Sequence, residues 1–204
     1  MPAGVRRAVQ GDVDAASAVL ADAFADYPWT RWTVESRCHA ERVEGLQRLS
    51  MGQIALPYGE VWVACDDGDT VMSVAVWMLP NSVVPGGVLS KVGAAQATLE
   101  GVRHAASVKA EECVARLRPT RPHYYLGAVG TRRNRQRQGL GTAVLTPILD
   151  RADRENEPVF LETSASENVR FYLGLGFVAI SETDIPDGGP HVWAMMRDRL
   201  TTRS

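Results

Sequence analysis

The sequence predicts an α/β (α+β) fold in which one mixed sheet is flanked by helices. Two apolar segments, 60–66 and 70–79, bracket the hairpin signal Asp67-Gly68 and indicate a strand pair. Farther along, strands and helices alternate before two closing strands, and this order predicts a mixed sheet with helices on its faces. The 204 residues, 45% of them hydrophobic, suffice for a single domain over 1–204 with a sizeable core.

The N-terminal part is predicted to contain a short strand and two helices. Residues 5–9 form the expected strand, and Asp12 is expected to cap the next helix. Pro28 disfavours helix at the residue before it and therefore ends this helix. A second helix is expected over 35–56. The first helix carries apolar residues at helical spacing: Val13, Ala16, Val19, Leu20 and Phe24.

The rest of the chain is predicted to hold helices between the strands. Residues 88–117 are rich in Ala, Glu and Val and are expected to form one or two helices. The later elements are expected as a strand at 124–131, a helix at 139–156, a strand at 159–166, a short helix at 168–175, and strands at 177–183 and 191–197.

Composition excludes several classes of protein. The net charge of −2 disfavours a general nucleic-acid-binding protein. Three widely spaced cysteines, Cys38, Cys65 and Cys113, form no metal-ligand spacing and no disulfide framework, so we expect no metal and three reduced, mostly buried thiols. The N-terminus lacks the apolar region of a signal peptide, and no apolar run reaches the length of a membrane span. We therefore expect a cytoplasmic protein that does not bind membranes.

The segment 136–141, Gln-Arg-Gln-Gly-Leu-Gly, lies between a predicted strand and a predicted helix. The first N–H groups of a helix are unpaired, and the helix dipole places about half a positive charge there. Gly139 and Gly141 leave room for a phosphate to approach the backbone, and Arg137 adds positive charge. The segment lacks the lysine of a Walker loop and the third glycine of a dinucleotide fingerprint. It therefore predicts an anion-binding turn of moderate specificity.

Two other interpretations of this turn are open. The first is an ordinary glycine-containing connection between a strand and a helix, which would have the same sequence pattern. A nucleic-acid patch is the other, but its cluster is short, the chain is acidic overall, and no aromatic residues are interleaved with it. The arginines concerned are Arg132, Arg133, Arg135 and Arg137.

Two longer segments together carry a resemblance to a known family. They are AVGTRRNRQRQGLGTAVL and FLETSASENVRFYLGLGF, at residues 128–145 and 160–177. The pair resembles the GNAT (GCN5-related N-acetyltransferase) superfamily, and ADAFADYP, VWVACDDGDTVMSVAVW and WAMMR extend the likeness to puromycin N-acetyltransferases over nearly the whole chain. The likeness is weakest around 88–117. It implies a mostly antiparallel sheet of about six to seven strands, with a V-shaped opening between the fourth and fifth.

The resemblance also implies acetyl-CoA as the acetyl donor and assigns residues to it. Backbone groups of Val129, Gly130 and Thr131 would bind the pantetheine arm, and an N–H near Val129 would stabilise the thioester oxyanion. Gly127 and Gly130 are compatible with a bulge that splays the strand, or with tight packing against a helix. The remaining candidates are Gln136, Arg137, Gln138, Gly139, Leu140, Gly141 and Thr142 at the turn, and Asn168 and Tyr172 in the short helix.

Two side chains are candidates for proton transfer. Tyr172 matches the tyrosine that protonates the departing CoA thiolate in such enzymes, although an aromatic core residue beside Phe171 and Phe177 would look the same. Glu162 lies among apolar neighbours, where a carboxylate is costly unless it is paired or used. It is predicted to deprotonate the acceptor amine, to orient the acceptor, or to form a structural hydrogen bond.

The break after the first helix borders the acceptor site in this superfamily. Asp26, Tyr27 and Trp29 are therefore candidates for acceptor binding, as is Trp193 on the last strand, with core packing as the alternative for the aromatic residues. The leading hypothesis is direct acetylation of a small-molecule primary amine, with puromycin or a related aminonucleoside as the candidate acceptor. A protein N-terminus or another metabolite amine, a non-catalytic CoA sensor, and a monomeric or homodimeric state stay open.

Overall fold

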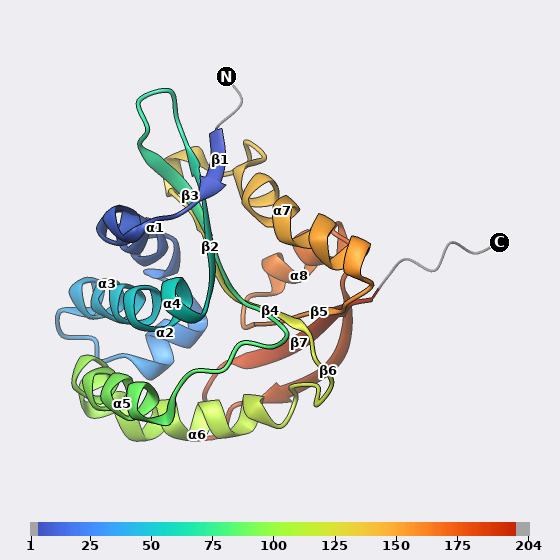
Figure 1. Cartoon of the computed structure of the whole chain (residues 1–204). Helices are drawn as coiled ribbons and strands as arrows, with labels where there is room; N and C mark the ends of the chain where they lie inside the picture. The colour runs from blue at the N-terminus through green and yellow to red at the C-terminus, as the bar shows by residue number, and fades with distance from the viewer. Residues whose placement is uncertain (1–3, 199–204) are drawn as a thin grey trace.

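The computed structural model describes residues 4–198, and in that range one seven-stranded sheet organises the fold (Figure 1). Its strand order is β1-β2-β3-β4-β5-β7-β6. The strands are β1 (Gly4–Arg7), β2 (Gly59–Cys65), β3 (Val71–Met78), β4 (Tyr124–Thr131), β5 (Val159–Thr163), β6 (Val178–Asp184) and β7 (His191–Arg197). The helices are α1 (Val13–Phe24), α2 (Pro28–Thr33), α3 (His39–Ser50), α4 (Leu56–Tyr58), α5 (Gly86–Glu100), α6 (His104–Ala115), α7 (Leu140–Glu155) and α8 (Ser166–Leu173).

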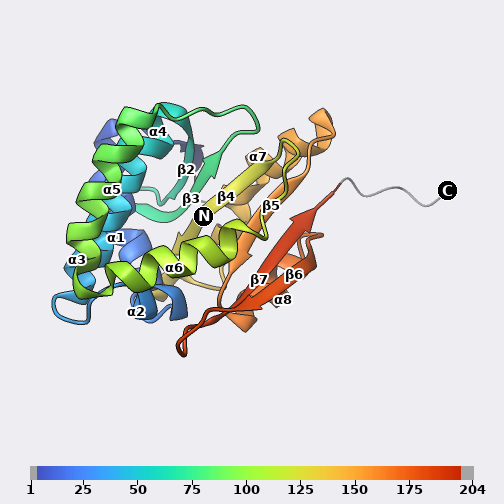
Figure 2. The same ribbon diagram turned by 90° about the horizontal axis from the view of Figure 1, so that it is seen from below.

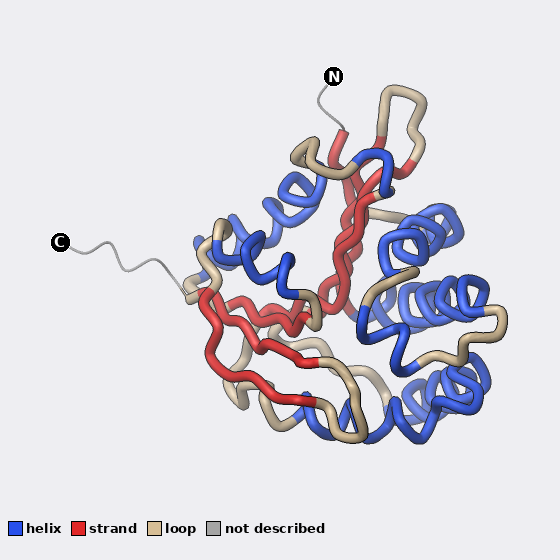
Figure 3. Tube along the Cα trace, turned by 180° about the vertical axis from the view of Figure 1, so that it is seen from behind, coloured by secondary structure: helices blue, strands red, loops and turns tan. Residues whose placement is uncertain are grey.

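Neighbouring strands of the sheet are antiparallel except at one place. Strands β4 and β5 run parallel, because helix α7 carries the chain back to the starting edge between them. All other neighbours pair antiparallel. The predicted mixed, mostly antiparallel sheet flanked by helices is confirmed. Figure 3 shows the strands as one curved layer with helices on either side.

The parallel pair is short and its strands then separate. Beyond three residue pairs, β4 and β5 have no further pairing in the described part of the chain. The paired residues are Tyr124 with Val159, Tyr125 with Phe160, and Leu126 with Leu161. The sheet therefore opens between its fourth and fifth strands, toward their carboxyl ends.

A bulge in β4 lies at the start of this opening. Ala128 lies opposite Val76 of β3. The next pair places Leu126 opposite Trp77. Gly127 is therefore an extra residue in β4, and such an insertion bends a strand and increases its twist. The bulge coincides with the point where β4 leaves β5.

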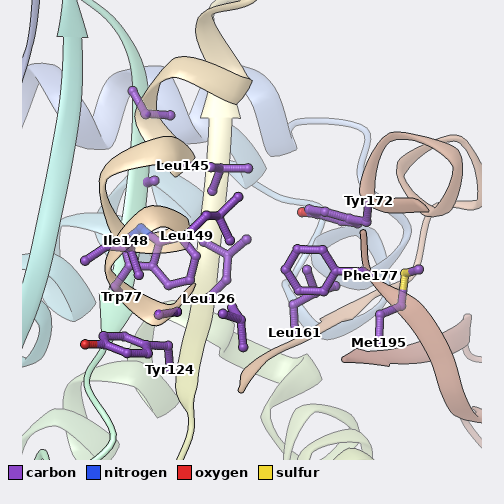
Figure 4. Close-up of a cluster of buried hydrophobic side chains, with 14 of the residues drawn as sticks. Trp77, Tyr124, Leu126, Leu145, Ile148, Leu149, Leu161, Tyr172, Phe177 and Met195 are labelled. Atoms are coloured by element: carbon purple, nitrogen blue, oxygen red, sulfur yellow. The ribbon is translucent and has the colours of Figure 1, made fainter. Parts of the chain in front are cut away.

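Side chains alternate between two cores on the two faces of the sheet. On one face, Val61, Val63 and Val74 pack against α1 and the π turn after α3. On the other face, Ala75 and Trp77 pack against α7, as Figure 4 shows for Trp77. The helix face that meets them is formed by Val144, Leu145, Ile148, Leu149 and Ala152. The i, i+3/i+4 spacing of these residues explains why this segment is an amphipathic helix.

Helices α5 and α6 confirm the expectation of one or two helices over 88–117. Figure 2 shows α5 beside α3, and α6 extending from there toward β5 and β7. Ala110 and Val114 of α6 pack in a cluster with Ile185 and Val192 from the β6–β7 hairpin. Within residues 4–198, no helix combines the length and apolar character needed to cross a lipid bilayer.

Three local predictions hold only in part. The chain breaks at Tyr27 as expected, but Pro28 also begins α2, a helix that the sequence did not predict, because proline suits the first position of a helix. The single helix expected over 35–56 is divided into α3, a π turn at Met51–Ala55, and α4. Asp12 stands at the N-cap position of α1, but its side chain does not cap that helix, because its carboxylate accepts hydrogen bonds from Val9 N and from Arg6. Of the thiols, Cys65 is buried, Cys113 is half-buried and Cys38 is exposed.

Candidate active site

The opening between β4 and β5 presents backbone groups of β4. Arg132 N donates to Met72 O on β3 at 2.9 Å. Backbone groups along a strand point alternately to its two sides, so those of Gly130 face β3, and those of Val129 and Thr131 face the opening. Strand β5 has already diverged there. The predicted binding residues Val129 and Thr131 are thus placed to bond an extended ligand as a strand would.

The two glycines of β4 are required for different structural reasons. Gly127 is the bulge residue. Gly130 instead lies under α1, where an added Cβ would stand 2.8 Å from the Ala23 Cβ and 3.0 Å from the Leu20 Cδ2. Both interpretations drawn from the sequence therefore hold, one at each position. Gly130 fixes how closely α1 approaches the opening.

Gly130→Ala is expected to destabilise the fold by about 1–3 kcal/mol, because the new methyl group overpacks the α1–β4 contact. Gly93→Ala is the matched control, since a Cβ at this position in α5 meets nothing within 4 Å. Alanine favours a helix interior over glycine, so the control should gain up to about 1 kcal/mol. Urea unfolding measures both changes. Equal stability of the two variants would contradict the close packing.

Helix α7 begins in the predicted phosphate turn. Gly139 has φ of +80°, a conformation that favours glycine, and serves as the N-cap without a side chain. Its carbonyl accepts the first helical bond from Ala143 N at 2.9 Å. The N–H groups of Leu140, Gly141 and Thr142 precede that bond and are the unpaired first N–H groups of the helix. A Cβ at Gly141 would stand 3.7 Å from the Phe171 ring and would narrow the space above these donors.

The four arginines before α7 divide into two groups. Arg132 donates from Nε to Val71 O at 2.9 Å, and Arg133 pairs with Asp26 at 2.7 Å, so both hold the turn in place. The side chains of Arg135 and Arg137 are exposed and form no ion pair within residues 4–198. Arg137 also has φ of +60°. Of the four arginines, Arg135 and Arg137 are therefore the two whose charges are available to a bound anion.

Arg137→Ala is expected to raise the KM for acetyl-CoA about 5- to 10-fold, because one exposed charge contact with a phosphate is lost. The kcat at saturating acetyl-CoA should stay within about twofold. Arg154→Ala removes the same charge from the exposed far end of α7 and is the matched control. Steady-state kinetics at varied acetyl-CoA measures the change. A large loss of kcat with unchanged KM would contradict phosphate binding by Arg137.

Tyr172 lies at the inner end of the opening. Its ring is 5% exposed and packs edge-on against Phe177, with the hydroxyl directed toward β4 in Figure 4. Burial, helped by the nearby Tyr27 hydroxyl, raises the pKa of Tyr172 well above its ordinary value. No described residue hydrogen-bonds to its hydroxyl. Asn168, one turn earlier in α8, lines the same cavity, so α8 presents both predicted side chains to one space.

Glu162 lines the same cavity and has both carboxylate oxygens engaged. Arg118 Nε donates to Oε1 at 2.8 Å, and the Tyr125 hydroxyl donates to Oε2 at 2.7 Å. Burial, with the adjacent Glu162 charge, raises the pKa of Tyr125, so this hydroxyl keeps its proton. The side chain of Glu162 is only 10% exposed. These contacts support an orienting or structural role more than direct deprotonation of an acceptor.

The break between α1 and α2 is fastened to the end of β5. The Tyr27 hydroxyl accepts from Ser164 N at 2.7 Å and shares a 2.9 Å hydrogen bond with Thr163 Oγ1. Trp29 N donates to Ser164 Oγ at 3.2 Å. Tyr27 and Trp29 also line the cavity that holds Tyr172. They therefore combine a structural role with a position in the wall of this cavity.

Two predicted acceptor residues lie elsewhere. Asp26 is exposed and paired with Arg133, which lowers the pKa of its carboxyl. Trp193 packs against His191 on β7, with ring centroids 4.4 Å apart. Neither residue is among those that line the cavity around Tyr172 in the described structure.

Two adjoining cavities meet at this place. The first, about 150 Å³, contains Val129, Asn168 and Tyr172 at the opening. The second, about 540 Å³, lies between β3–β4 and helices α1, α3 and α5. Both are lined by Phe24, Tyr27, Trp29, Glu111, Arg118, Tyr125, Gly127 and Ala128. The helical segment 88–117 thus contributes to the site.

Sequence reasoning missed three residues of this site: Glu111, Arg118 and Tyr125. Glu111 and Arg118 belong to the α6 region, where the family resemblance is weakest and the helical period alone marks no polar site. The sequence held one signal for Tyr125. It follows Tyr124 in a predicted strand, where neighbouring side chains point to opposite faces, so the two tyrosines could not both lie on the same face of the sheet.

Comparison with known proteins agrees with this geometry. Residues 22–177 match the family model described as the acetyltransferase (GNAT) family. A Corynebacterium glutamicum ATCC 13032 structure, described as histone acetyltransferase HPA2 and related acetyltransferase, is 25% identical, with full coverage of both chains and a TM-score of 0.75.

Two further structures share the fold at lower identity. An agmatine N-acetyltransferase variant is 13% identical, with 97% of this chain and 100% of the other covered and a TM-score of 0.64. The Escherichia coli ribosomal-protein-S18-alanine N-acetyltransferase is 16% identical, with 96% and 92% covered and a TM-score of 0.54.

Proposed function

The chain belongs to the acetyltransferase (GNAT) family, and we propose that it transfers the acetyl group of acetyl-CoA to a primary amine of a small molecule. One observation carries this proposal: the strand opening with its free β4 backbone adjoins both the cavity that contains Tyr172 and the N-terminus of α7, where a Cβ at Gly141 would stand 3.7 Å from Thr131 Oγ1. Direct transfer between two bound substrates is the corresponding mechanism.

The site fits acetyl-CoA group by group. The N–H groups of Leu140, Gly141 and Thr142 would receive the pyrophosphate, aided by Arg135 and Arg137. The backbone of Thr131 and Val129 would bond the pantetheine arm along the β4 side of the opening. Gln136 completes the turn by directing its side-chain amide toward Thr131 O at 3.4 Å. These donors lead from the protein surface to the cavity that contains Tyr172.

The reaction forms two bonds and breaks two. The neutral acceptor nitrogen bonds to the thioester carbonyl carbon, the carbon–sulfur bond breaks, and one N–H proton passes in net to the thiolate. An acceptor that binds as an ammonium ion first releases one further proton to solvent. The Val129 N–H would stabilise negative charge on the carbonyl oxygen. A tyrosine is protonated at neutral pH, and burial raises the pKa of Tyr172 further, so its hydroxyl has a proton to donate to the departing sulfur.

Puromycin or a related aminonucleoside is the acceptor that we propose first. The whole-chain resemblance to puromycin N-acetyltransferases supports it, as does the size of the adjoining cavity. Removing a proton at pH 7 costs about 1 kcal/mol from an α-amino group and about 4.6 kcal/mol from a lysine side chain. An α-amino acceptor therefore needs no strong base, in agreement with a Glu162 already held by Arg118 and Tyr125.

Thiol release from acetyl-CoA, measured with a panel of amines, tests this function. The panel contains puromycin, L-phenylalaninamide, agmatine and a peptide with a free N-terminus, with products identified by mass spectrometry. We expect N-acetylation of an aromatic α-amine and no acetyl group left on the enzyme after incubation with acetyl-CoA alone. Tight CoA binding without turnover on any amine would instead indicate a sensor.

A further inference from the structure

One carboxylate at the junction of the two cavities has unused hydrogen-bonding capacity. Glu111 of α6 lines both cavities. Its Oε2 accepts a long contact of 3.3 Å from Arg118 Nη2, and no described residue donates to its Oε1. The side chain is 47% exposed and contributes to the lining of both cavities.

The local charges favour a cation at Glu111. Glu111 and Glu162 contribute two carboxylates, and Arg118, which contacts both, contributes one guanidinium. The three groups together therefore carry an excess of one negative charge. The shorter hydrogen bond of Arg118 goes to Glu162, from Nε to Oε1 at 2.8 Å, and its guanidinium lies over the Tyr125 ring. Glu111 is the carboxylate that is left to pair with a ligand.

The pKa of Glu111 agrees with this arrangement. Burial raises the pKa of the carboxyl above its ordinary range, and the Glu162 and Glu100 charges act in the same direction, against Arg118. A positively charged group bound beside Glu111 would offset these effects.

The larger cavity beside Glu111 joins an apolar part to a polar part that includes Gln96, Glu100 and Ser107. Its floor contains Val76, Met78 and Ala128 from β3 and β4. Its walls contain Leu46, Leu49, Met51 and Ile54 from the α3 segment, and Leu89 and Val92 from α5. An apolar or aromatic group fits such walls, whereas a polar chain would lose its hydration there.

We propose that Glu111 receives the charged amino group of the acceptor and that the apolar part of the larger cavity holds the acceptor's body. This inference rests on the acetyl transfer proposed above and narrows its substrate class to cationic primary amines with a large apolar or aromatic group. The α5–α6 segment is then the part of the chain that selects the acceptor, while β4, α7 and α8 bind the donor.

A pair of small ligands tests the assignment. L-Phenylalaninamide carries the amine, and 3-phenylpropanamide has the same body without it. Their binding is measured by calorimetry at pH 6.5, where the α-amine is mostly protonated. The wild type should bind the charged ligand at least tenfold more tightly. Glu111→Gln should reduce that ratio to about one, because a charge-assisted hydrogen bond is lost.

Glu112→Gln is the matched control, because Glu112 is the adjacent, exposed glutamate of the same helix and lies outside both cavity linings. It should keep the wild-type ratio. Glu111→Asp, which retains the charge, should lie between the wild type and Glu111→Gln. The KM for acetyl-CoA should stay unchanged in every variant, which shows that the donor side is intact.

An unchanged ratio in folded Glu111→Gln, or a wild type that binds neither ligand, would overturn the assignment. The function itself is tested separately by turnover of the wild type. A wild type that prefers the charged ligand through Glu111 but acetylates no amine would contradict the proposed function and leave the amine-binding role of Glu111 supported.

Discussion

Tyr172→Phe is expected to lower kcat about 100-fold, with little change in the KM for acetyl-CoA. The variant removes the hydroxyl that would protonate the leaving thiolate, and general acid catalysis contributes about 10²–10⁴-fold. The lower end applies because a thiol is a fair leaving group. Stability should change little, since no described residue hydrogen-bonds to this hydroxyl and the ring contacts with Phe177 remain. Initial rates at saturating substrates measure the effect.

Tyr58→Phe is the control for this loss, because Tyr58 lines a separate cavity beside Tyr124 and Arg151. It should retain the wild-type kcat. A Tyr172→Phe enzyme with a kcat within about threefold of the wild type would show that the sulfur is protonated by another group. Tyr172 would then be a core residue, as the sequence alone allows.

Arg118→Met is expected to destabilise the protein by about 2 kcal/mol and to reduce acceptor turnover strongly. The arginine holds Glu162 at 2.8 Å and also contacts Glu111, so its loss leaves two carboxylates without a counter-charge. Breaking a fully buried ion pair costs about 3–5 kcal/mol. We expect the smaller loss of about 2 kcal/mol for Arg118→Met because the Arg118 side chain is 35% exposed. Guanidinium unfolding and the acetyl transfer assay measure the two effects.

A double variant separates the effect of the unpaired Glu162 charge from the effect of lost side-chain packing on the stability of Arg118→Met. Arg118→Met/Glu162→Gln should recover about half of the lost stability, because the unpaired carboxylate is removed together with its partner. Arg116→Met replaces an exposed arginine nearby and should change neither stability nor turnover. If the double variant is less stable than Arg118→Met, the side-chain packing of Glu162 outweighs its charge.

The residues that we propose to bind the donor could be identified from the sequence because the elements that carry them are local. The turn at 136–141, its helix and the pair Asn168 and Tyr172 each depend on short spacings within one strand–helix unit. The bulge at Gly127 was one of two open explanations, because a glycine in a strand also suits close packing. Register with β3 resolves it at Gly127 in favour of the bulge.

The residues that we propose to bind the acceptor could not be identified because their contacts are distant in sequence. Arg118 connects Glu111 of α6 to Glu162 of β5 only in the folded chain. Helical periodicity places Ala110 and Val114 in the core but gives no sign that Glu111 faces a cavity. Arg133 likewise forms an ion pair with Asp26, which is distant in sequence, so this predicted acceptor-binding residue has another partner.

The structure of the chain crystallised with acetyl-CoA tests the central claim most directly. We expect the pyrophosphate at the N–H groups of Leu140–Thr142, the pantetheine arm along Val129 and Thr131, and the sulfur within hydrogen-bonding distance of the Tyr172 hydroxyl. Acetyl-CoA bound with its thioester outside the β4–β5 opening, or with its sulfur remote from Tyr172, would contradict it.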